Sequence, residues 1–464
     1  MTDRAIARLG AIFVVLFVLL AVRQFWIQVV IGPKLAANQY NPRHTQIAVG
    51  RGSILATDGT PLAVTRGAKR VYPQGSLVAQ AVGYASARYG TAGLEDAFDR
   101  ALTAHTDAVD PFTQLQQIVA GTQGAPRGAD VVTTLDLPIQ VALVAGLSRY
   151  ARAAGVVLDP RTGAVLALAS IPSYDPNKVD AQWSVLLHDP ASPLLDRSTA
   201  GLYPPGSTFK VVTAADALDA GVVTPQSTFS DYGGLTIGNF TVHNDEEEVT
   251  GTQDLAGAFA LSSNVDFAQI ALKIGVDRWF EYAAKWGLGE PVAFDLPVTR
   301  DHLPAKKDVY AGILAQLGFG QASLLVTPMR MALIGATIAH DGTTPRPYLV
   351  RRLGGGETGI ATRPETIAQP ITADTAHEVR DVMVEVVKRG TGTAARLPGV
   401  TVAGKTGTAT NPHGRSHAWF VAFAPAEAPR VAVAVVVENV GYGGTYAAPI
   451  AREVLRVALA RQRR

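Results

Sequence analysis

The sequence predicts an α+β fold, an antiparallel sheet covered by helices, for the region from residue 149 to the C-terminus of this 464-residue chain. Residues with high β propensity gather near both ends of this region, at 155–158, 164–169, 400–408, 417–423 and 431–438. The middle of the region shows helical patterns around residues 207 and 262, and a last helix is expected from about 447 to 461. Strands that come first and last, with helices between them, indicate one sheet packed against helices rather than alternating βα units.

The N-terminal residues contain a long apolar segment. Residues 9–22 are apolar without interruption and 25–31 extend the run, which together reach about the 20 residues that a bilayer requires. Arg23 lies near the outer third, where its side chain can reach the interface. Arg4 and Arg8 precede the span, so the tail of residues 1–8 is expected in the cytoplasm. A cleaved signal peptide and a buried helix are the alternatives. Because no small-residue cleavage site is evident, we favour an uncleaved transmembrane anchor at 9–31.

Residues 32–148 are expected to form a separate, non-catalytic domain, since the length of the chain suggests two to three domains. This region mixes short strands, Gly/Pro breaks and one helical stretch at 93–103. The catalytic domain then spans 149–464. It opens with a hairpin, because the turn sequence 159–163 separates the strands predicted at 155–158 and 164–169.

Composition excludes several classes of function. The chain has no cysteine, so disulfides, thiolate nucleophiles and cysteine-based metal sites are excluded. Its formal net charge is +2 and no run of lysines or arginines occurs, which argues against nucleic-acid binding. The acidic segment Asp245-Glu246-Glu247-Glu248 is expected to be a solvated loop. We expect neither a metal nor a cofactor.

The first chemically informative segment is Ser207-Thr208-Phe209-Lys210. A serine hydroxyl requires a base within hydrogen-bond reach, and residues three apart lie on one face of a helix. Pro204-Pro205-Gly206 ends a loop, and the apolar run after Lys210 predicts a helix that begins near Ser207. Ser207 is therefore a candidate nucleophile and Lys210 its candidate base. A lysine acts as a base only where burial or a neighbouring cation lowers its pKa. Lys405 is a candidate for that second cation.

The segment Lys405-Thr406-Gly407-Thr408 has a competing interpretation. Residues 399–406 match the phosphate-binding pattern G-x-x-x-x-G-K-[ST]. That loop requires a preceding strand and a helix that opens at the lysine, whereas here the β-prone residues lie between the two glycines. We interpret the segment instead as an edge strand that returns through a hairpin to residues 417–423. On such a strand, Gly407 would allow a substrate backbone to approach closely, and the N–H groups of Thr408 and Ser207 would stabilise an oxyanion. The hydroxyls of Thr406 and Thr408, backed by Lys405, would bind a substrate carboxylate.

Ser262-Ser263-Asn264 is the least specific of the three segments, since Ser-x-Asn is common and usually marks a cap or a turn. Its position between two helical patterns is the informative feature. There, Ser262 is a candidate proton relay between Lys210 and a leaving amine. Asn264 is a candidate for holding a substrate amide.

Taken together and in this order, S-x-x-K, S-x-N and K-T-G resemble the active-site motifs of penicillin-binding proteins and serine β-lactamases. The chain is similar to class B penicillin-binding proteins, in particular the short ones of GC-rich Gram-positive bacteria, from about residue 50 to about residue 450. The segments that carry the resemblance are 51–54, 58–59, 133–136 with Gln140, 159–168, 172–177, 204–210, 390–393, 403–409 and 417–425.

The resemblance implies a peptidoglycan D,D-transpeptidase of the penicillin-binding/serine β-lactamase-like fold, with an extended pedestal at 32–148. Ser207 would attack the D-Ala-D-Ala amide of a stem peptide and release D-Ala, and an amine of a second stem peptide would then take the acyl group. Lys210 would be the general base and Asn264 would also position it, while Ser262 and Lys405 would relay protons. β-Lactam antibiotics would acylate the same serine. The implied location is the cell membrane, with the catalytic domain outside, in cell-wall synthesis for cell shape or division. The implied partner is a SEDS-type membrane glycan polymerase.

Two other functions remain open on the same fold. Ser-Thr-Phe-Lys also occurs in class D β-lactamases, but those enzymes usually have an apolar residue at the position of Asn264, lack a pedestal and are released by a cleaved signal. A non-enzymatic protein of this fold would be a β-lactam sensor or a scaffold for the wall machinery; the intact set of three motifs argues against a pure scaffold, but a sensor would also keep its serine. Cross-linking of stem peptides would distinguish a transpeptidase from a sensor.

Overall fold

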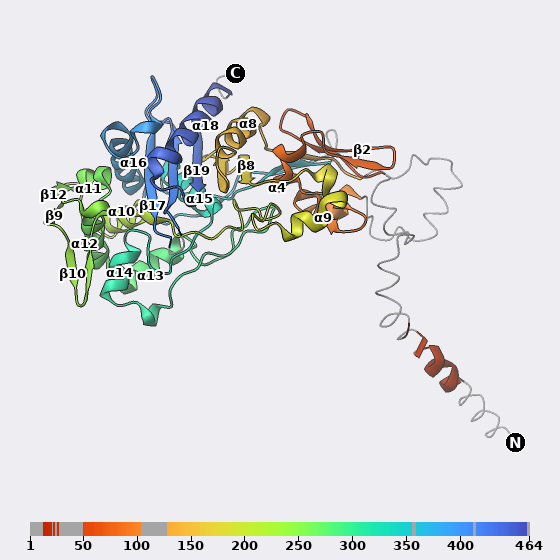
Figure 1. Cartoon of the computed structure of the whole chain (residues 1–464), viewed down its shortest axis with the longest axis horizontal. Helices are drawn as coiled ribbons and strands as arrows, with labels where there is room; N and C mark the ends of the chain where they lie inside the picture. The colour runs from red at the N-terminus through yellow and green to blue at the C-terminus, as the bar shows by residue number, and fades with distance from the viewer. Residues whose placement is uncertain are drawn as a thin grey trace.

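The computed structural model describes residues 13–20, 22, 23, 26, 50–103, 128–354, 359–411 and 414–461. Its centre is a five-stranded antiparallel sheet of order β17-β18-β19-β7-β8 (Figure 1). The strands are β7 Ala153–Leu158, β8 Val165–Ile171, β17 Ala403–Ala409, β18 His417–Ala424 and β19 Val431–Val437. The expected pairing of early and late strands is therefore present, and β17 is the expected edge strand.

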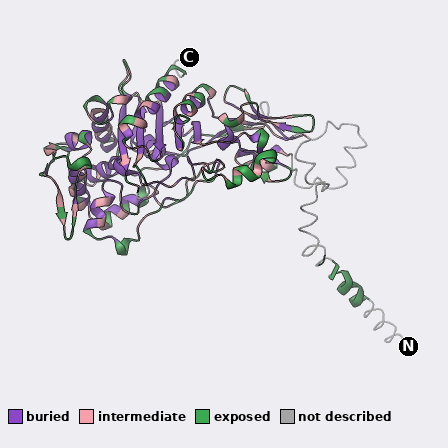
Figure 2. Cartoon of the chain, viewed as in Figure 1, coloured by how far each residue is buried: buried purple, intermediate pink, exposed green. Residues whose placement is uncertain are grey.

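Helices cover both faces of this sheet. On one face lie α8 Leu137–Leu147 and the C-terminal helix α18 Ala448–Arg461, whose apolar side chains pack against alternate residues of the strands. On the other face lie α10 Lys210–Asp219, α15 Pro328–Ala339 and α16 Ala373–Arg389. Every residue of α15 is buried, and the sheet lies in the buried interior of the molecule (Figure 2). Each large apolar side chain buried in this way contributes about 1.5–3 kcal/mol.

A helical region continues beyond α10 and α16 and contains two short hairpin-like pairs. Its helices are α11 Leu255–Leu261, α12 Asn264–Ile274, α13 Val276–Lys285 and α14 Ala311–Leu317. Strand β9 Thr228–Asp231 pairs with β12 Gly251–Asp254, and β10 Leu235–Ile237 pairs with β11 Phe240–Val242. Three short helical elements border the site described below: η4 Gly206–Phe209, η5 Asp245–Glu247 and α17 Gly443–Tyr446.

The N-terminal part forms a second sheet of order β15-β14-β6-β1-β2-β3. Its strands are β1 Ile54–Leu55, β2 Pro61–Arg66, β3 Lys69–Val71, β6 Val131–Thr133, β14 Val350–Leu353 and β15 Ile360–Ala361. The same part contains the helices α4 Ala79–Val82, α5 Leu94–Ala97, α6 Asp99–Leu102 and α9 Val179–His188. The helix expected at 93–103 is thus two short helices that meet at Phe98. The smaller elements are η2 Gly75–Leu77, β4 Ala85–Ser86, β5 Gly90–Thr91, η3 Pro176–Lys178, η6 Lys306–Asp308, β13 Thr344–Pro345, β16 Thr366–Ala368 and η8 Thr393–Ala395.

Chain order and spatial order differ at the junction of the two parts. Strands β14 and β15 come from the middle of the catalytic region, yet they complete the N-terminal sheet. Helix α8 precedes residue 149, yet it packs on α18 and β8. The boundary expected at residue 148 remains a prediction, and the chain crosses between the two parts more than once.

The membrane anchor predicted at 9–31 lies mostly outside the described residues. Within the portions of the chain that the structure describes, no helix has both the length and the apolar character needed to cross a membrane.

Candidate active site

Ser207 lies in η4, a tight turn that leads directly into α10 at Lys210. The turn is held by the Thr208 hydroxyl, which donates to Pro205 O at 2.7 Å, and by Gly206 N–H, which donates to Gly320 O at 2.9 Å. Gly206 has φ +55, and a Cβ there would meet Thr408 O at 2.9 Å. Glycine is therefore required where the turn meets strand β17. The helix expected from Ser207 is confirmed, with the refinement that its regular α-helical part begins at Lys210.

Ser262, Ser263 and Asn264 lie at the break between α11 and α12, as the sequence predicts. Helix α11 ends at Ser262, which has the left-handed conformation (φ 62, ψ 36). Ser263 caps α12, because its hydroxyl accepts from Asp266 N–H at 3.1 Å. Two changes of direction within three residues present the carbonyl and hydroxyl of Ser262 and the amide of Asn264 to Lys210.

The Lys210 ammonium donates three hydrogen bonds, to Ser262 O at 2.6 Å, Asn264 Oδ1 at 2.8 Å and Ser262 Oγ at 3.3 Å. These acceptors match the three N–H groups of an ammonium, and the hydrogen bonds of Lys210 go to this set rather than to the Ser207 hydroxyl. The side chain is fully buried, and burial lowers the pKa of Lys210 to about 7. Lys210 therefore loses its proton near neutral pH, as a base for Ser207 must.

Lys405, on β17, also contacts Ser262, which Lys210 contacts as well. Its ammonium donates to Ser262 Oγ at 2.7 Å and to Thr406 O at 3.3 Å. Lys405 is fully buried, and burial together with the positive charge of Lys210 holds the pKa of Lys405 well below its ordinary value. The Ser262 hydroxyl thus lies between two amines, and the pKa of each is lower than that of an ordinary lysine.

An aromatic pair forms the apolar surroundings of the two amines. Lys210 Nζ lies 5.5 Å from the ring centroid of Phe267, and Lys405 Nζ lies 5.5 Å from that of Phe259. The rings pack edge to face with centroids 5.7 Å apart, and both are fully buried. Because two phenylalanine rings take the place of water beside the amines, burial is the main cause of the lowered pKa of Lys210 and Lys405.

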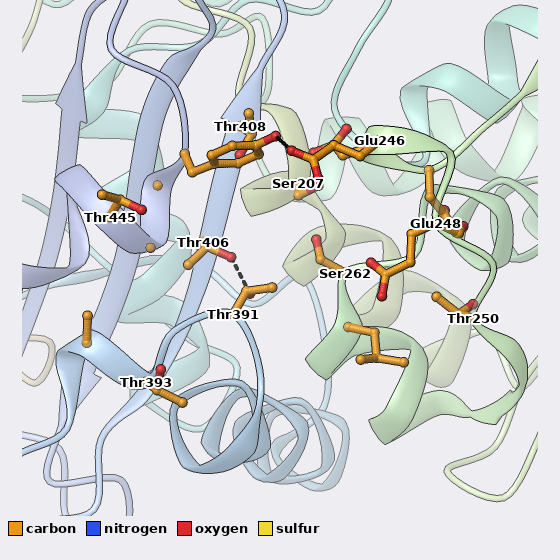
Figure 3. A pocket seen from close by; sticks show the side chains of 17 residues that line it. Ser207, Glu246, Glu248, Thr250, Ser262, Thr391, Thr393, Thr406, Thr408 and Thr445 are labelled. Atoms are coloured by element: carbon orange, nitrogen blue, oxygen red, sulfur yellow. Dashed lines mark hydrogen bonds between the residues drawn. The ribbon is translucent and has the colours of Figure 1, made fainter.

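Ser207 opens into a cleft of about 500 Å³ (Figure 3). Hydroxyl side chains line one wall: Thr391, Thr393, Thr406, Thr408 and Thr445. The opposite wall carries Asp245, Glu246, Glu248 and Thr250. The acidic segment expected to be a solvated loop is exposed, but it also borders the site, where Tyr442 Oη donates to Glu246 Oε1 at 2.5 Å.

A second cavity of about 320 Å³ shares Ser207, Asp245 and Thr408 with the first. Its remaining wall is less acidic and includes Phe240, Phe319 and the amides of Asn264, Gln316 and Gln321. Ser207 is therefore accessible from two differently lined cavities.

Gly407 is required by the protein's own packing. A Cβ at this position would meet Thr208 Cγ2 at 2.9 Å and Pro205 O at 3.0 Å. Strand β17 therefore approaches the turn that carries Ser207 as closely as glycine permits. Lys405 pairs with Val421 and Gly407 with Trp419 in the ladder to β18, so the segment is a strand and no helix opens at the lysine. The phosphate-loop interpretation is excluded.

All eight residues singled out from the sequence converge in this region: Ser207, Lys210, Ser262, Asn264, Lys405, Thr406, Gly407 and Thr408. Sequence reasoning missed the acidic wall, the Phe259–Phe267 pair, Asn244 and the buried carboxylate of Asp266. Only the acidic wall had a visible signal, a run of four carboxylates shortly before Ser262.

Known protein families and curated proteins match this chain along most of its length. The family described as penicillin binding protein transpeptidase domain matches residues 153–456, and the penicillin binding protein A dimerisation domain matches residues 51–131. The peptidoglycan D,D-transpeptidase PbpA of Mycolicibacterium smegmatis is 36% identical over 459 residues, covering 92% of this chain and 91% of that protein. The peptidoglycan D,D-transpeptidase MrdA of Escherichia coli K12 is 32% identical, covering 81% of this chain and 69% of that protein.

Solved structures of penicillin-binding proteins have a similar fold. Penicillin-binding protein A of M. tuberculosis, as its ceftriaxone acyl-enzyme complex, superposes with a TM-score of 0.81 at 35% identity, covering 90% of this chain and all of that one. The D,D-transpeptidase domain from Eggerthella lenta gives 0.80 at 36% identity, covering 89% and 98%. Family match, overall similarity and active-site motifs coincide on one region, and the chain belongs to the penicillin-binding protein transpeptidase family, among the class B proteins.

Proposed function

We propose that this chain is a serine D,D-transpeptidase that cross-links peptidoglycan stem peptides through an acyl-enzyme on Ser207. One observation carries the proposal: two fully buried lysines hydrogen-bond the same hydroxyl, Ser262 Oγ, beside a serine that opens into a cleft. Buried amines with lowered pKa values accept and release protons near neutral pH, which acyl transfer from an amide requires. The relatives named D,D-transpeptidase align along nearly the whole chain.

Acylation follows from this geometry. Ser207 Oγ attacks the carbonyl carbon of the D-Ala-D-Ala amide while neutral Lys210 takes the serine proton. As the bond from carbon to the leaving nitrogen breaks, the proton passes through Ser262 Oγ to the departing amine, and Lys405 holds the hydroxyl in place. The N–H groups of Ser207 and Thr408 are the proposed oxyanion donors. Such donors typically contribute about 3–4 kcal/mol each.

Transfer uses the same groups in reverse. An amine of a second stem peptide attacks the ester carbonyl, gives its proton to the Lys210–Ser262 pair, and the bond from carbon to Ser207 Oγ breaks as the serine regains its proton. A transferase requires access for donor and acceptor, and the two cavities that share Ser207 supply it. Thr406 and Thr408, with Lys405 behind them, are proposed to bind the terminal carboxylate of the donor.

β-Lactams are proposed to acylate Ser207 by the same attack, and the solved relatives include β-lactam acyl-enzymes. We also propose, from the sequence, that residues 9–31 anchor the chain in the cell membrane with the catalytic domain outside. Residues 32–148 are proposed as the pedestal and 149–464 as the transpeptidase domain. The proposed partner is a SEDS-type glycan polymerase, in cell-wall synthesis for cell shape or division.

Intact mass of the protein incubated with benzylpenicillin and followed over hours tests the proposal. A single stable adduct, absent from Ser207→Ala, is expected. An adduct that clears within minutes while the drug is consumed would indicate a β-lactam hydrolase. No adduct would refute the catalytic assignment, and an adduct that persists in Ser207→Ala would mean a different nucleophile. Cross-linking of stem peptides by wild type then separates transpeptidase from sensor.

A further inference from the structure

The side chain of Asn244 makes five hydrogen bonds at a point where three parts of the site meet. It is partly buried and precedes the acidic segment of the cleft wall. Its side-chain oxygen faces the start of α12, and its side-chain nitrogen faces β9 and the acidic segment. None of the three active-site motifs includes it.

On the α12 side, Asn244 Oδ1 accepts from Asn264 N–H at 2.7 Å, from Val265 N–H at 3.1 Å and from the Ser263 hydroxyl at 3.3 Å. The first N–H groups of a helix have no partner within the helix. Asn244 therefore completes the cap that Ser263 begins, and it fixes the backbone of the residue whose side chain holds Lys210.

The neighbouring residue holds the Asn264 side chain itself. Asn264 Nδ2 donates to His243 O at 3.2 Å, while Asn264 Oδ1 accepts from Lys210 Nζ at 2.8 Å. The segment of His243 and Asn244 thus contacts Asn264 at its backbone and at its amide group. Rotation or displacement of Asn264 would move one of the three acceptors of the Lys210 ammonium.

On the opposite side, Asn244 Nδ2 donates to Asp231 Oδ2 at 2.6 Å and to Glu248 O at 2.8 Å. Asp231 is fully buried, and its Oδ2 also accepts from the N–H and hydroxyl of Thr250, each at 2.9 Å, while Oδ1 accepts from Gly233 N–H. Burial alone would raise the pKa of Asp231, but these hydrogen bonds lower it below its ordinary value. An ionised carboxylate only accepts hydrogen bonds, so the amide nitrogen of Asn244 must face Asp231 and its oxygen must face α12.

We propose that Asn244, oriented by Asp231, is a positioning residue for the base of the acyl-transfer reaction, acting on Lys210 through Asn264. This inference rests on the proposed function. Loss of Asn244 leaves two helix N–H groups without a protein acceptor and releases Asn264, so the Lys210 ammonium loses a fixed acceptor next to Ser207. The chemical step is slowed. Asn244 also lines the cleft, but its side-chain oxygen and nitrogen are engaged in the five hydrogen bonds above, so the first, non-covalent binding of an acylating ligand depends mainly on the other lining residues.

Saturation kinetics of acylation by nitrocefin separate these two effects in the full-length protein. The first-order acylation constant k2 reports on the chemical step, and the half-saturation constant K reports on the preceding binding. For Asn244→Ala we expect k2 to fall at least tenfold while K changes by less than threefold. The matched control is Gln269→Ala, which also removes a side-chain link from α12 to β9, because Gln269 Nε2 donates to Ser230 O at 3.0 Å, yet does not touch the S-x-N motif. Both of its constants should stay within twofold of wild type.

The outcomes are decisive. A folded Asn244→Ala with k2 within twofold of wild type overturns the inference, as does a loss confined to K. If Asn244→Ala does not fold, Asp231→Asn, which keeps the size of the side chain but places an NH2 group among donors, takes its place. A fall in k2 of at least threefold at unchanged K supports the inference, and an unchanged k2 overturns it. If the wild-type protein is not acylated at all, the proposed function is refuted, and this outcome is distinct from an unchanged k2 in the variants, which overturns only the inference about Asn244.

Discussion

Asp266 is a buried carboxylate at the active site whose removal is predicted to stabilise the protein. It lies in the first turn of α12, is fully buried, and neither of its oxygens accepts a hydrogen bond from the described residues. Burial raises the pKa of Asp266 from 3.8 to about 6. At neutral pH the folded protein therefore keeps an ionised carboxylate in a site that disfavours the charge.

The magnitude follows from linkage. The folded protein binds the Asp266 proton more tightly than the unfolded chain does, so the cost of ionisation is absent well below pH 3.8, grows as the pH rises, and is complete above about pH 6. The difference between the two pKa values corresponds to about 3 kcal/mol at pH 7.5 and about 1 kcal/mol at pH 4.5. Asp266→Asn keeps the size of the side chain without the charge. It should raise the free energy of unfolding by about 2–3 kcal/mol at pH 7.5, and by much less at pH 4.5.

Urea unfolding followed by tryptophan fluorescence at both pH values measures this effect. The control is Asp308→Asn, an exposed carboxylate on η6, for which the change should stay within about 0.5 kcal/mol. A destabilised Asp266→Asn at pH 7.5, or a gain that does not shrink at pH 4.5, would refute the reasoning. Either result would mean that the carboxylate is stabilised in its ionised form.

Three further predictions concern the acylation of the protein by penicillins. Lys210→Ala should lower the acylation rate about 10²- to 10⁴-fold, the usual contribution of a general base, and acylation at near wild-type rate would show that Lys210 is not the base. The wild-type rate should rise with pH and reach half its maximum near pH 7, because the base must be neutral, and Asp266→Asn should move this midpoint to lower pH, since the negative charge of Asp266 raises the pKa of Lys210. A rate that is flat between pH 5.5 and 8.5 would contradict that assignment. Ser262→Ala should slow acylation about 100-fold without lowering the final amount of adduct, as measured by intact mass over time; an unchanged rate would remove Ser262 from the proton path.

The parts of the site that the sequence predicts correctly depend on local geometry. A serine and a lysine three residues apart need only a helical turn to share a face, and the break between α11 and α12 appears as two separate apolar patterns. The edge strand at 403–409 could be recognised because β-prone residues lie just before Lys405 and the residues that follow it cannot open a helix. Each of these inferences uses no more than about ten consecutive residues.

The features that escaped prediction depend on distant parts of the chain. Asn244 stands before a run of carboxylates in an irregular segment, and its role becomes visible only once β9 places Asp231 beside it. Phe259 and Phe267 look like ordinary core residues of two helices until the lysines are seen above their rings. Strands β14 and β15 join the N-terminal sheet about 200 residues after β6, a pairing that no local pattern indicates.

The arrangement of the two lysines also limits how many protons the site holds. The two Nζ atoms lie 3.3 and 2.7 Å from Ser262 Oγ and so are no farther than about 6 Å from each other, a separation at which two unit charges repel by about 3 kcal/mol at an effective dielectric constant of 20. Both ammonium groups contact the one hydroxyl of Ser262, lie on apolar rings and are fully buried, so burial adds to this repulsion. Keeping both amines charged at neutral pH is therefore unfavourable, in keeping with the lowered pKa of both lysines. In the proposed mechanism a neutral Lys210 takes the proton when Ser207 attacks, and Ser262 Oγ, which contacts both amines, lies where that proton can pass to either side.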